Sequence, residues 1–226
     1  MRKSLKAART LAQEFAGQHA PADVPRSISV VEGETVRTIL KPAKQERVGL
    51  IVMGTHGHTG LTRVRVGSVM DSVVRKAPVP VVTVGPQVKS TARLGTFRRV
   101  ICPVNFDDLA RAALEHAAAV AERTCAEVQV IHVREQSPEL LGDSGKASHE
   151  LCEWVAPELR QRCSMREATL EGNAAEQIVA EAGRSQADLI VMGARPRNLL
   201  GAILFGSTTE TVIRNARCPI LLVNPK

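Results

Sequence analysis

The sequence predicts an α/β protein whose open parallel sheets carry helices on both faces. Hydrophobic residues make up 44% of the 226-residue chain, and they occur as short Val/Ile/Leu runs alternating with Ala-rich stretches of helical spacing. The apolar runs are continuous, as expected of parallel strands that are covered on both sides. In addition, residues 31–86 and 170–225 are two copies of one sequence at a constant offset, which indicates a duplicated unit.

The repeat runs without a gap at an offset of 139 residues, and 18 of the 56 aligned positions are identical. The same offset places Met1 on Leu140, whereas the second copy begins some forty residues earlier, near Arg98. The first copy is therefore expected to contain only the last three strands and the last three helices of the unit. We considered three explanations, in this order of preference: a start codon upstream of Met1, a true truncation, and completion by another chain.

The second copy is predicted to fold as βαβαβαβαβ. Either Asp107 or Asp108 can cap its first helix, whose apolar face consists of Ala110, Ala113, Leu114, Ala117, Ala118 and Ala121. Short β-branched runs bounded by breakers mark the strands. The strands are expected at 100–104, 127–133, 164–170, 189–192 and 220–223, and the helices at 109–123, 148–162, 174–185 and 208–215. The predicted domains are 1–86 (incomplete) and 98–226 (complete), joined by a linker at 87–97.

Composition excludes several classes of protein. No apolar run approaches membrane-spanning length, and residues 1–18 have the spacing of an amphipathic helix without the apolar core of a signal peptide. Aromatic residues make up only 2% of the chain, which argues against base stacking. The net charge of +7 is dispersed, so it predicts a basic surface or an anionic ligand before nucleic acid. Five cysteines without a CxxC pair are typical of a cytoplasmic protein with free thiols.

A glycine-marked loop in the first copy is the first candidate site. Gly54, Gly57 and Gly67 lie between a predicted strand and a helix that starts near Ser68. Such glycines let backbone N–H groups approach an anion, and the helix start adds more of them. The other interpretation is a tight strand-to-helix turn without a ligand. His56 and His58 lie in the same loop, but without further ligands nearby we expect surface histidines and no metal site.

Three motifs together resemble those of the universal stress protein family: VICPVNFD (100–107), DLIVMG (188–193) and G-x2-G-x9-G-S (54–68). The resemblance covers nearly the whole chain. It implies a five-stranded parallel sheet of order 3-2-1-4-5 in each complete domain, and pairing of domains through their last strands, within a chain or in a homodimer. Some family members bind ATP and others do not.

Carried over residue by residue, the resemblance implies a nucleotide site with defects in both copies. Asn105 stands where ATP-binding members have an acidic residue, and Pro196 replaces the second loop glycine, which removes an N–H donor. The first copy keeps its loop glycines but lacks the strand that contacts the nucleoside. The candidate residues are Gly54, Gly57, Gly67 and Ser68 in the first copy, and Pro103, Asn105, Val133, Met192, Gly193, Gly206 and Ser207 in the second.

The function expected from these features is that of a cytoplasmic, non-enzymatic stress-response protein that binds ATP weakly or not at all. One alternative is an ATP-independent scaffold that acts through domain pairing and an unidentified protein partner. Another is a nucleotide-hydrolysing or nucleotidyl-transfer enzyme, which lacks an acid/base pair or metal cluster near either loop. Neither nucleic acid nor a membrane is expected as a partner, because the sequence contains no motif that recognises bases and no apolar run long enough to span a membrane.

Overall fold

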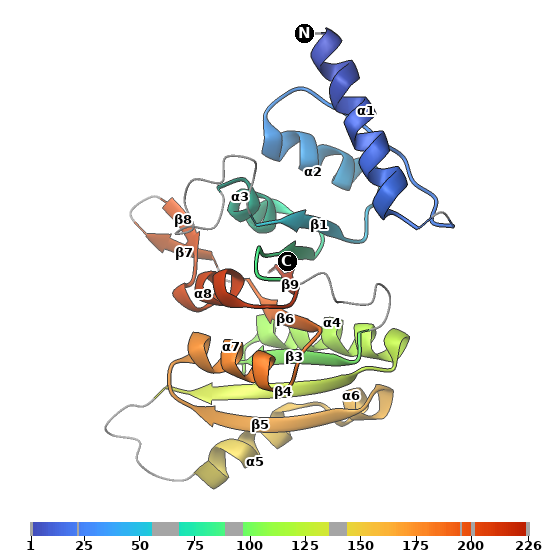
Figure 1. The fold of residues 1–226 in the computed structure, drawn as a ribbon. Coiled ribbons are helices and arrows are strands. Elements are labelled where there is room, and N and C mark those ends of the chain that lie inside the picture. The colour runs from blue at the N-terminus through green and yellow to red at the C-terminus, as the bar shows by residue number, and fades with distance from the viewer. Residues whose placement is uncertain are drawn as a thin grey trace.

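One seven-stranded sheet runs through both copies of the repeat in the computed structural model (Figure 1). The structure describes residues 2–21, 23–55, 68–88, 97–135, 144–194, 196–199 and 202–224. The strand order is β1-β2-β9-β6-β3-β4-β5, and all neighbours are parallel except β2 and β9. The strands are β1 (Ile51–Gly54), β2 (Val81–Val84), β3 (Arg99–Val104), β4 (Glu127–Arg134), β5 (Met165–Glu171), β6 (Leu189–Gly193) and β9 (Ile220–Val223).

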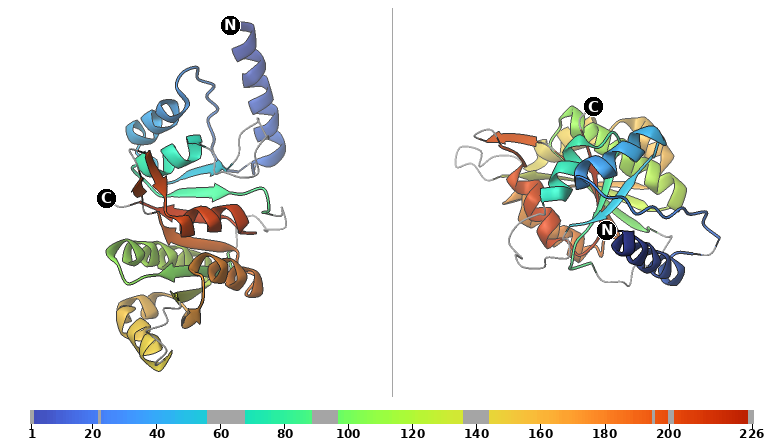
Figure 2. Two further views of the ribbon diagram at one scale, coloured as in Figure 1. Left: turned by 90° about the vertical axis from the view of Figure 1, so that its left-hand side faces the viewer. Right: turned by 90° about the horizontal axis from the view of Figure 1, so that it is seen from above.

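Helices cover both faces of this sheet, and Figure 2 shows α4 and α7 on opposite sides of it. One core packs α2, α3, α7 and α8 against the strands, and the other packs α4, α5 and α6. The helices are α1 (Arg2–His19), α2 (Thr35–Gln45), α3 (Ser68–Lys76), α4 (Asp108–Thr124), α5 (Ser144–Trp154), α6 (Pro157–Arg162), α7 (Ala174–Arg184) and α8 (Ser207–Asn215). None of the described helices combines the length and the apolar character needed to cross a membrane.

The second copy has the predicted strand order. Its strands follow the order β5-β4-β3-β6-β9, which is 3-2-1-4-5 in chain order. The carboxylate of Asp107 accepts a hydrogen bond from the Ala110 N–H at 2.6 Å and thereby caps α4. All six predicted apolar positions of α4 are buried. Local helical spacing therefore identified the face that the sheet buries.

The helix predicted at 148–162 is wrong, because the structure has two helices there, α5 and α6. Ala156 is extended, with φ −59° and ψ 133°, and Pro157 is the first residue of α6. A proline disfavours helical backbone at the preceding residue and suits the first turn of a new helix. The guanidinium of Arg160 then donates to the carbonyl oxygens of Cys152 and Val155 at 2.6 and 2.8 Å, so it satisfies the end of α5.

The expectation of three strands in the first copy is also wrong, since among its described residues only β1 and β2 form and the segment expected as the third strand is not one. Residues 25–32, which correspond by the repeat to β5, have no strand structure. In the second copy β5 pairs with β4 alone, and the sequence holds no counterpart of β4 for the first copy. A segment without a pairing partner leaves its backbone groups to water. The predicted N-terminal helix does form as α1, yet Leu11 and Phe15 on it are exposed.

A short hairpin replaces the loop expected after β6. Strand β7 (Pro196–Leu199) pairs antiparallel with β8 (Ala202–Phe205). Pro196 is the first residue of β7, a position where a strand tolerates proline. Pro196, which replaces the second glycine of the motif, is therefore compatible with the hairpin that forms in this copy.

The two copies share backbone detail as well as sequence. Gly33 and its counterpart Gly172 both have positive φ, 151° and 124°, just before the helices α2 and α7. Glu34 and its counterpart Asn173 cap these helices through side-chain oxygens. Positive φ values of this size favour glycine, which explains why the glycine is identical in both copies. The repeat is thus a structural duplication over the last part of the unit.

The copies join through their last strands, β2 and β9, which pair antiparallel from Val81↔Leu222 to Thr83↔Ile220. The side-chain amide of Asn224 donates to the carbonyl oxygens of Val74 and Ala77 on the opposite copy. Both halves therefore belong to one continuous sheet with a shared core.

Candidate functional site

The candidate site lies at the carboxyl ends of β3, β4 and β6. Strand β3 stands between β4 and β6 and is parallel to both. The chain leaves β3 toward one side for β4 and returns on the other side for β6, so the crossover connections diverge at this point. Such a switch point leaves a crevice outside the strand ends, where ligands bind in open α/β sheets.

Asn105 follows β3 directly, and its side chain is exposed. Val133 lies near the end of the neighbouring strand β4 and is half-buried, as is Pro103 in β3. Adjacent strands therefore bring these three predicted residues to one edge of the sheet. Asn105 offers an amide oxygen and an amide NH2 there, without charge.

An aromatic cluster that the sequence analysis missed fixes the turn beside Asn105. Phe106 has a φ of 64°, unusual for a bulky residue, and its ring lies 4.3 Å from the His132 ring and 5.8 Å from the Trp154 ring between centroids. The guanidinium of Arg111 lies 4.6 Å from the centre of the Trp154 ring. Nδ1 of His132 donates to the Val104 carbonyl oxygen at 3.0 Å. The sequence did contain one signal for this cluster. Aromatic residues are so scarce in the chain that each of them, including Trp154 as the only tryptophan, is a candidate for a specific role.

Gly193, the last residue of β6, is required by packing. A Cβ at this position would lie 2.5 Å from Cγ and 2.9 Å from Cδ2 of Leu109, at the start of α4. Such contacts are too short, so any larger residue would force the Leu109 side chain to move. Met192 before it is buried in the core, where it packs with the residues of α7 and α8. The identity of Gly193 is thus explained without a phosphate.

The start of α8 completes the site. Gly206 is its N-cap residue, with φ −57° and ψ 147°, and as a glycine it has no side chain to cap the first turn. Ser207 opens the helix with an exposed hydroxyl. The first-turn N–H groups and the positive end of the helix dipole suit an anion. The negative charge of Glu210 in the first turn would repel an anion, but its carboxylate forms an ion pair with Arg214 at 3.0 Å.

The corresponding region of the first copy keeps fewer elements. Gly54 ends β1 and is exposed, and Ser68 opens α3. Gly57 and Gly67, like His56 and His58, lie outside the described residues. In the described part of the chain no strand lies beside β1 in the way that β3 lies beside β6.

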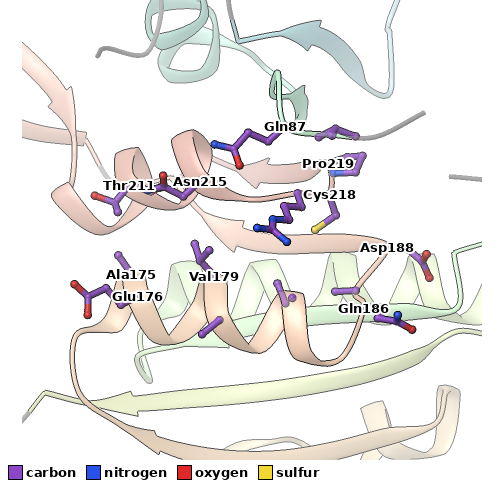
Figure 3. A pocket seen from close by; sticks show the side chains of 16 residues that line it. Gln87, Ala175, Glu176, Val179, Gln186, Asp188, Thr211, Asn215, Cys218 and Pro219 are labelled. Carbon is purple, nitrogen blue, oxygen red and sulfur yellow. The ribbon is translucent and has the colours of Figure 1, made fainter. Parts of the chain in front are cut away.

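A separate groove runs between α7 and α8, with a volume of about 910 Å³ (Figure 3). Val179 of α7 and Asn215 of α8 line it, and it extends to Asp188 and Cys218 at the amino ends of β6 and β9. It therefore lies at the end of the strands opposite Gly193. Burial raises the pKa of the Cys218 thiol to about 12, with Asp188 adding to the rise, so this cysteine is no nucleophile at neutral pH.

No group of three or more histidine, cysteine, aspartate or glutamate side chains that could hold a metal occurs within the described ranges. The chemistry on hand at the candidate site is accordingly an amide, a hydroxyl and backbone N–H groups. These groups recognise and orient an anion by hydrogen bonds.

Comparison with known proteins agrees with the duplicated fold. The model of the universal stress protein family matches residues 1–85 and 96–224. A universal stress protein of Methanocaldococcus jannaschii is 33% identical over 141 residues, covering 56% of this chain and 82% of the relative. One from Thermus aquaticus is 33% identical over 135 residues and is covered to 98%.

Among solved structures, a universal stress protein from Archaeoglobus fulgidus superposes with a TM-score of 0.71 at 25% identity, covering 99% of this chain and 76% of that one. This likeness extends over both copies. The family model matches both segments of the chain, and the relative from Methanocaldococcus jannaschii shares a third of its aligned residues over most of its length. The chain therefore belongs to the universal stress protein family.

Proposed function

We propose that this universal stress protein is a cytoplasmic, non-catalytic binder of an adenine nucleotide, with its site in the second copy. The observation that carries the proposal is the meeting of two features at one edge of the sheet. The crossover connections diverge at β3, and α8, which comes after the β7–β8 hairpin, starts from Gly206, a residue without a side chain to cap the first N–H groups. Together they supply the strand ends at which ligands bind in open α/β sheets and a donor set for phosphates.

The proposed pose follows from these elements. The phosphates accept hydrogen bonds from the first turn of α8 and from the Ser207 hydroxyl, while Asn105 contacts the ribose and Val133 packs against the base. Pro196 donates no backbone N–H, and Asn105 lacks the charge of a carboxylate. We therefore expect weak binding, with a Kd of about 0.1 to 1 mM, equivalent to about −4 to −5.5 kcal/mol.

The same contacts support a binding role over catalysis. An amide, a hydroxyl and backbone N–H groups hold a phosphate, whereas transfer or hydrolysis of a phosphoryl group also needs a positioned nucleophile and compensation of the developing charge. The aromatic cluster at Phe106 serves to hold the turn after β3 rather than to supply an acid or base.

Isothermal titration of ATP into the purified chain tests the proposal. Ser207→Asp places a negative charge at the start of α8, so it should abolish binding without harming the helix. Ser68→Asp is the matched control, because it makes the same change at the corresponding position of the first copy, and it should leave binding intact. Asn105→Asp should tighten binding. Binding that is lost in Ser68→Asp but kept in Ser207→Asp would move the site to the first copy, and absence of any heat would refute the proposal.

A second candidate function is the binding of a protein through the N-terminal half, without ATP. In the described part of the chain, the large apolar side chains that are exposed all lie before residue 85: Leu11, Phe15, Val24, Val31, Leu50, Val52 and Val84. A concentration of exposed apolar residues in one half of a molecule marks an interaction surface.

A further inference from the structure

The sheet face at β1 is bare where the matching face of β6 is covered. Val52 is 63% exposed and Leu50 is 44% exposed. Their counterparts in the repeat, Val191 and Leu189, are 0% and 2% exposed. The residues are identical in the two copies, so the difference arises from their surroundings. The molecule thus contains both a covered and an uncovered version of one surface.

The covered version shows what fits this surface. Strand β3 lies along the edge of β6, with Val100 opposite Leu189 and Ile101 opposite Ile190, both parallel. The helix α4 follows β3 and packs on the face that contains Val191, through its buried alanines. Its Leu109 fits against Gly193, whose counterpart in the first copy is Gly54. A parallel strand followed by an alanine-rich helix is therefore the complement of this surface.

The edge of β1 is also open to hydrogen bonding. The N–H groups of Ile51 and Thr55 donate to the carbonyl oxygens of Pro80 and Val84, on the side of β2. Because successive N–H groups of a strand point to opposite sides, those of Val52 and Gly54 face away from β2. No strand pairs with that side in the part of the chain that the structure describes, and β1 is the end strand in Figure 1.

We propose that β1 binds a strand–helix segment of the universal stress type: an apolar strand that adds in parallel at the free edge, followed by an alanine-rich helix that covers Leu50 and Val52. The occupant is not a second copy of this chain acting through its own β3 and α4. Those elements are already buried against β6, with Val100 and Ala117 fully buried. The inference concerns the first copy and stands apart from the nucleotide site proposed in the second.

A synthetic peptide of residues 98–124 is the natural probe, because the structure shows this strand and helix filling the matching surface. Fluorescently labelled peptide is titrated with the full chain and its anisotropy is followed. We expect saturable binding that Val52→Lys weakens at least about tenfold, since a lysine there would be buried under the helix. Val31→Lys is the control, because Val31 is also exposed, at 66%, but lies outside the sheet. It should leave the affinity unchanged.

A second measurement needs no variant and uses the wild-type chain with and without the peptide. Hydrogen exchange followed by NMR should show the Val52 amide slowing on addition of peptide, as expected when a free edge gains a strand. No saturable binding, or binding that Val52→Lys leaves unchanged, would overturn the proposal. Self-association of the chain without peptide that Val52→Lys abolishes would also overturn it, because a second copy would then be the occupant. ATP binding can fail independently of any of these outcomes.

Discussion

Truncating the same valine in each copy gives the sharpest test of the packing described here. Val52→Ala and Val191→Ala remove the same two carbon atoms from matching strands, β1 and β6. Val191 is fully buried beneath α4, and Val52 is mostly exposed. The two substitutions therefore share their chemistry and their position in the repeat. They differ in their surroundings, because β6 has a strand on each side and α4 on its face, whereas β1 is an end strand with an exposed face.

The expected losses of unfolding free energy follow from burial. Each buried methylene-sized group contributes about 0.8 kcal/mol, so two contribute about 1.6 kcal/mol at Val191. The cavity left in a rigid core adds about 1 kcal/mol, for a total of about 2.5 kcal/mol. At Val52 about a third of the burial remains and no closed cavity forms, which gives a loss of about 0.5 kcal/mol.

Urea unfolding measures both losses. Trp154 is the only tryptophan and lies in α5, so its fluorescence reports on the second copy, while far-UV circular dichroism reports on the whole chain. Coincidence of the two transitions tests whether the continuous sheet unfolds as one unit. A loss at Val52→Ala as large as that at Val191→Ala would show that the β1 face is covered in solution. Small losses at both positions would refute the packing of α4 on β6.

Three further predictions concern other parts of the molecule. Gly193→Ala should lower the unfolding free energy by about 1 to 3 kcal/mol, and a double-mutant cycle with Leu109→Ala should recover much of this loss; additive effects would show that the two residues do not clash. A thiol reagent at pH 8 should modify the exposed Cys125 in the native protein and Cys218 only after unfolding, so prompt reaction of Cys218 would contradict its burial. Burial raises the pKa of Asp71, against the pull of Arg75, so folding disfavours its ionised form. Its contribution to stability is thus greatest below about pH 4 and falls as the pH rises through the raised pKa. Asp71→Asn should therefore gain stability relative to the wild type between pH 4 and pH 7, and a constant difference in urea midpoint would refute this.

The elements that the sequence predicted best are those whose signals are local. The helix α4 carries its cap and its apolar face within one short segment. The apolar face is found as predicted, and the cap is Asp107, one of the two predicted candidates. The strand order of the second copy follows from alternating strands and helices together with the family resemblance. The repeat gave the correspondence of positions between the two copies, and the structure adds that the matching residues Gly33 and Gly172 both have positive φ.

The failures occur where structure depends on distant partners or on competing local choices. Residues 25–32 match a strand by sequence, yet a strand forms only when another supplies its hydrogen bonds. Pro157 lies inside the helix predicted at 148–162, and it keeps Ala156 out of the helical region, which divides the segment into two helices. The cluster of Phe106, His132 and Trp154 joins three separate elements, so no local pattern announces it. The candidate ligand contacts stay predictions, because packing against Leu109 alone accounts for Gly193.

The strand and helix that are lacking beside β1 are also the elements that a nucleotide site in the first copy would need. In the second copy β3 leads into Asn105, and α4 closes over Gly193 through Leu109. A partner segment of the same type, bound at β1, would bring its own residue after the strand to the end of β1 and next to Gly54.

Binding of the peptide and of ATP at the first copy should then be coupled, and such coupling is reciprocal. We expect saturating ATP to tighten peptide binding in the Ser207→Asp variant, whose second-copy site is disabled, by about three- to tenfold, or about 0.7 to 1.4 kcal/mol. Ser68→Asp combined with Ser207→Asp should remove the effect. Peptide affinity that does not respond to ATP in either variant would show that the completed surface binds protein only.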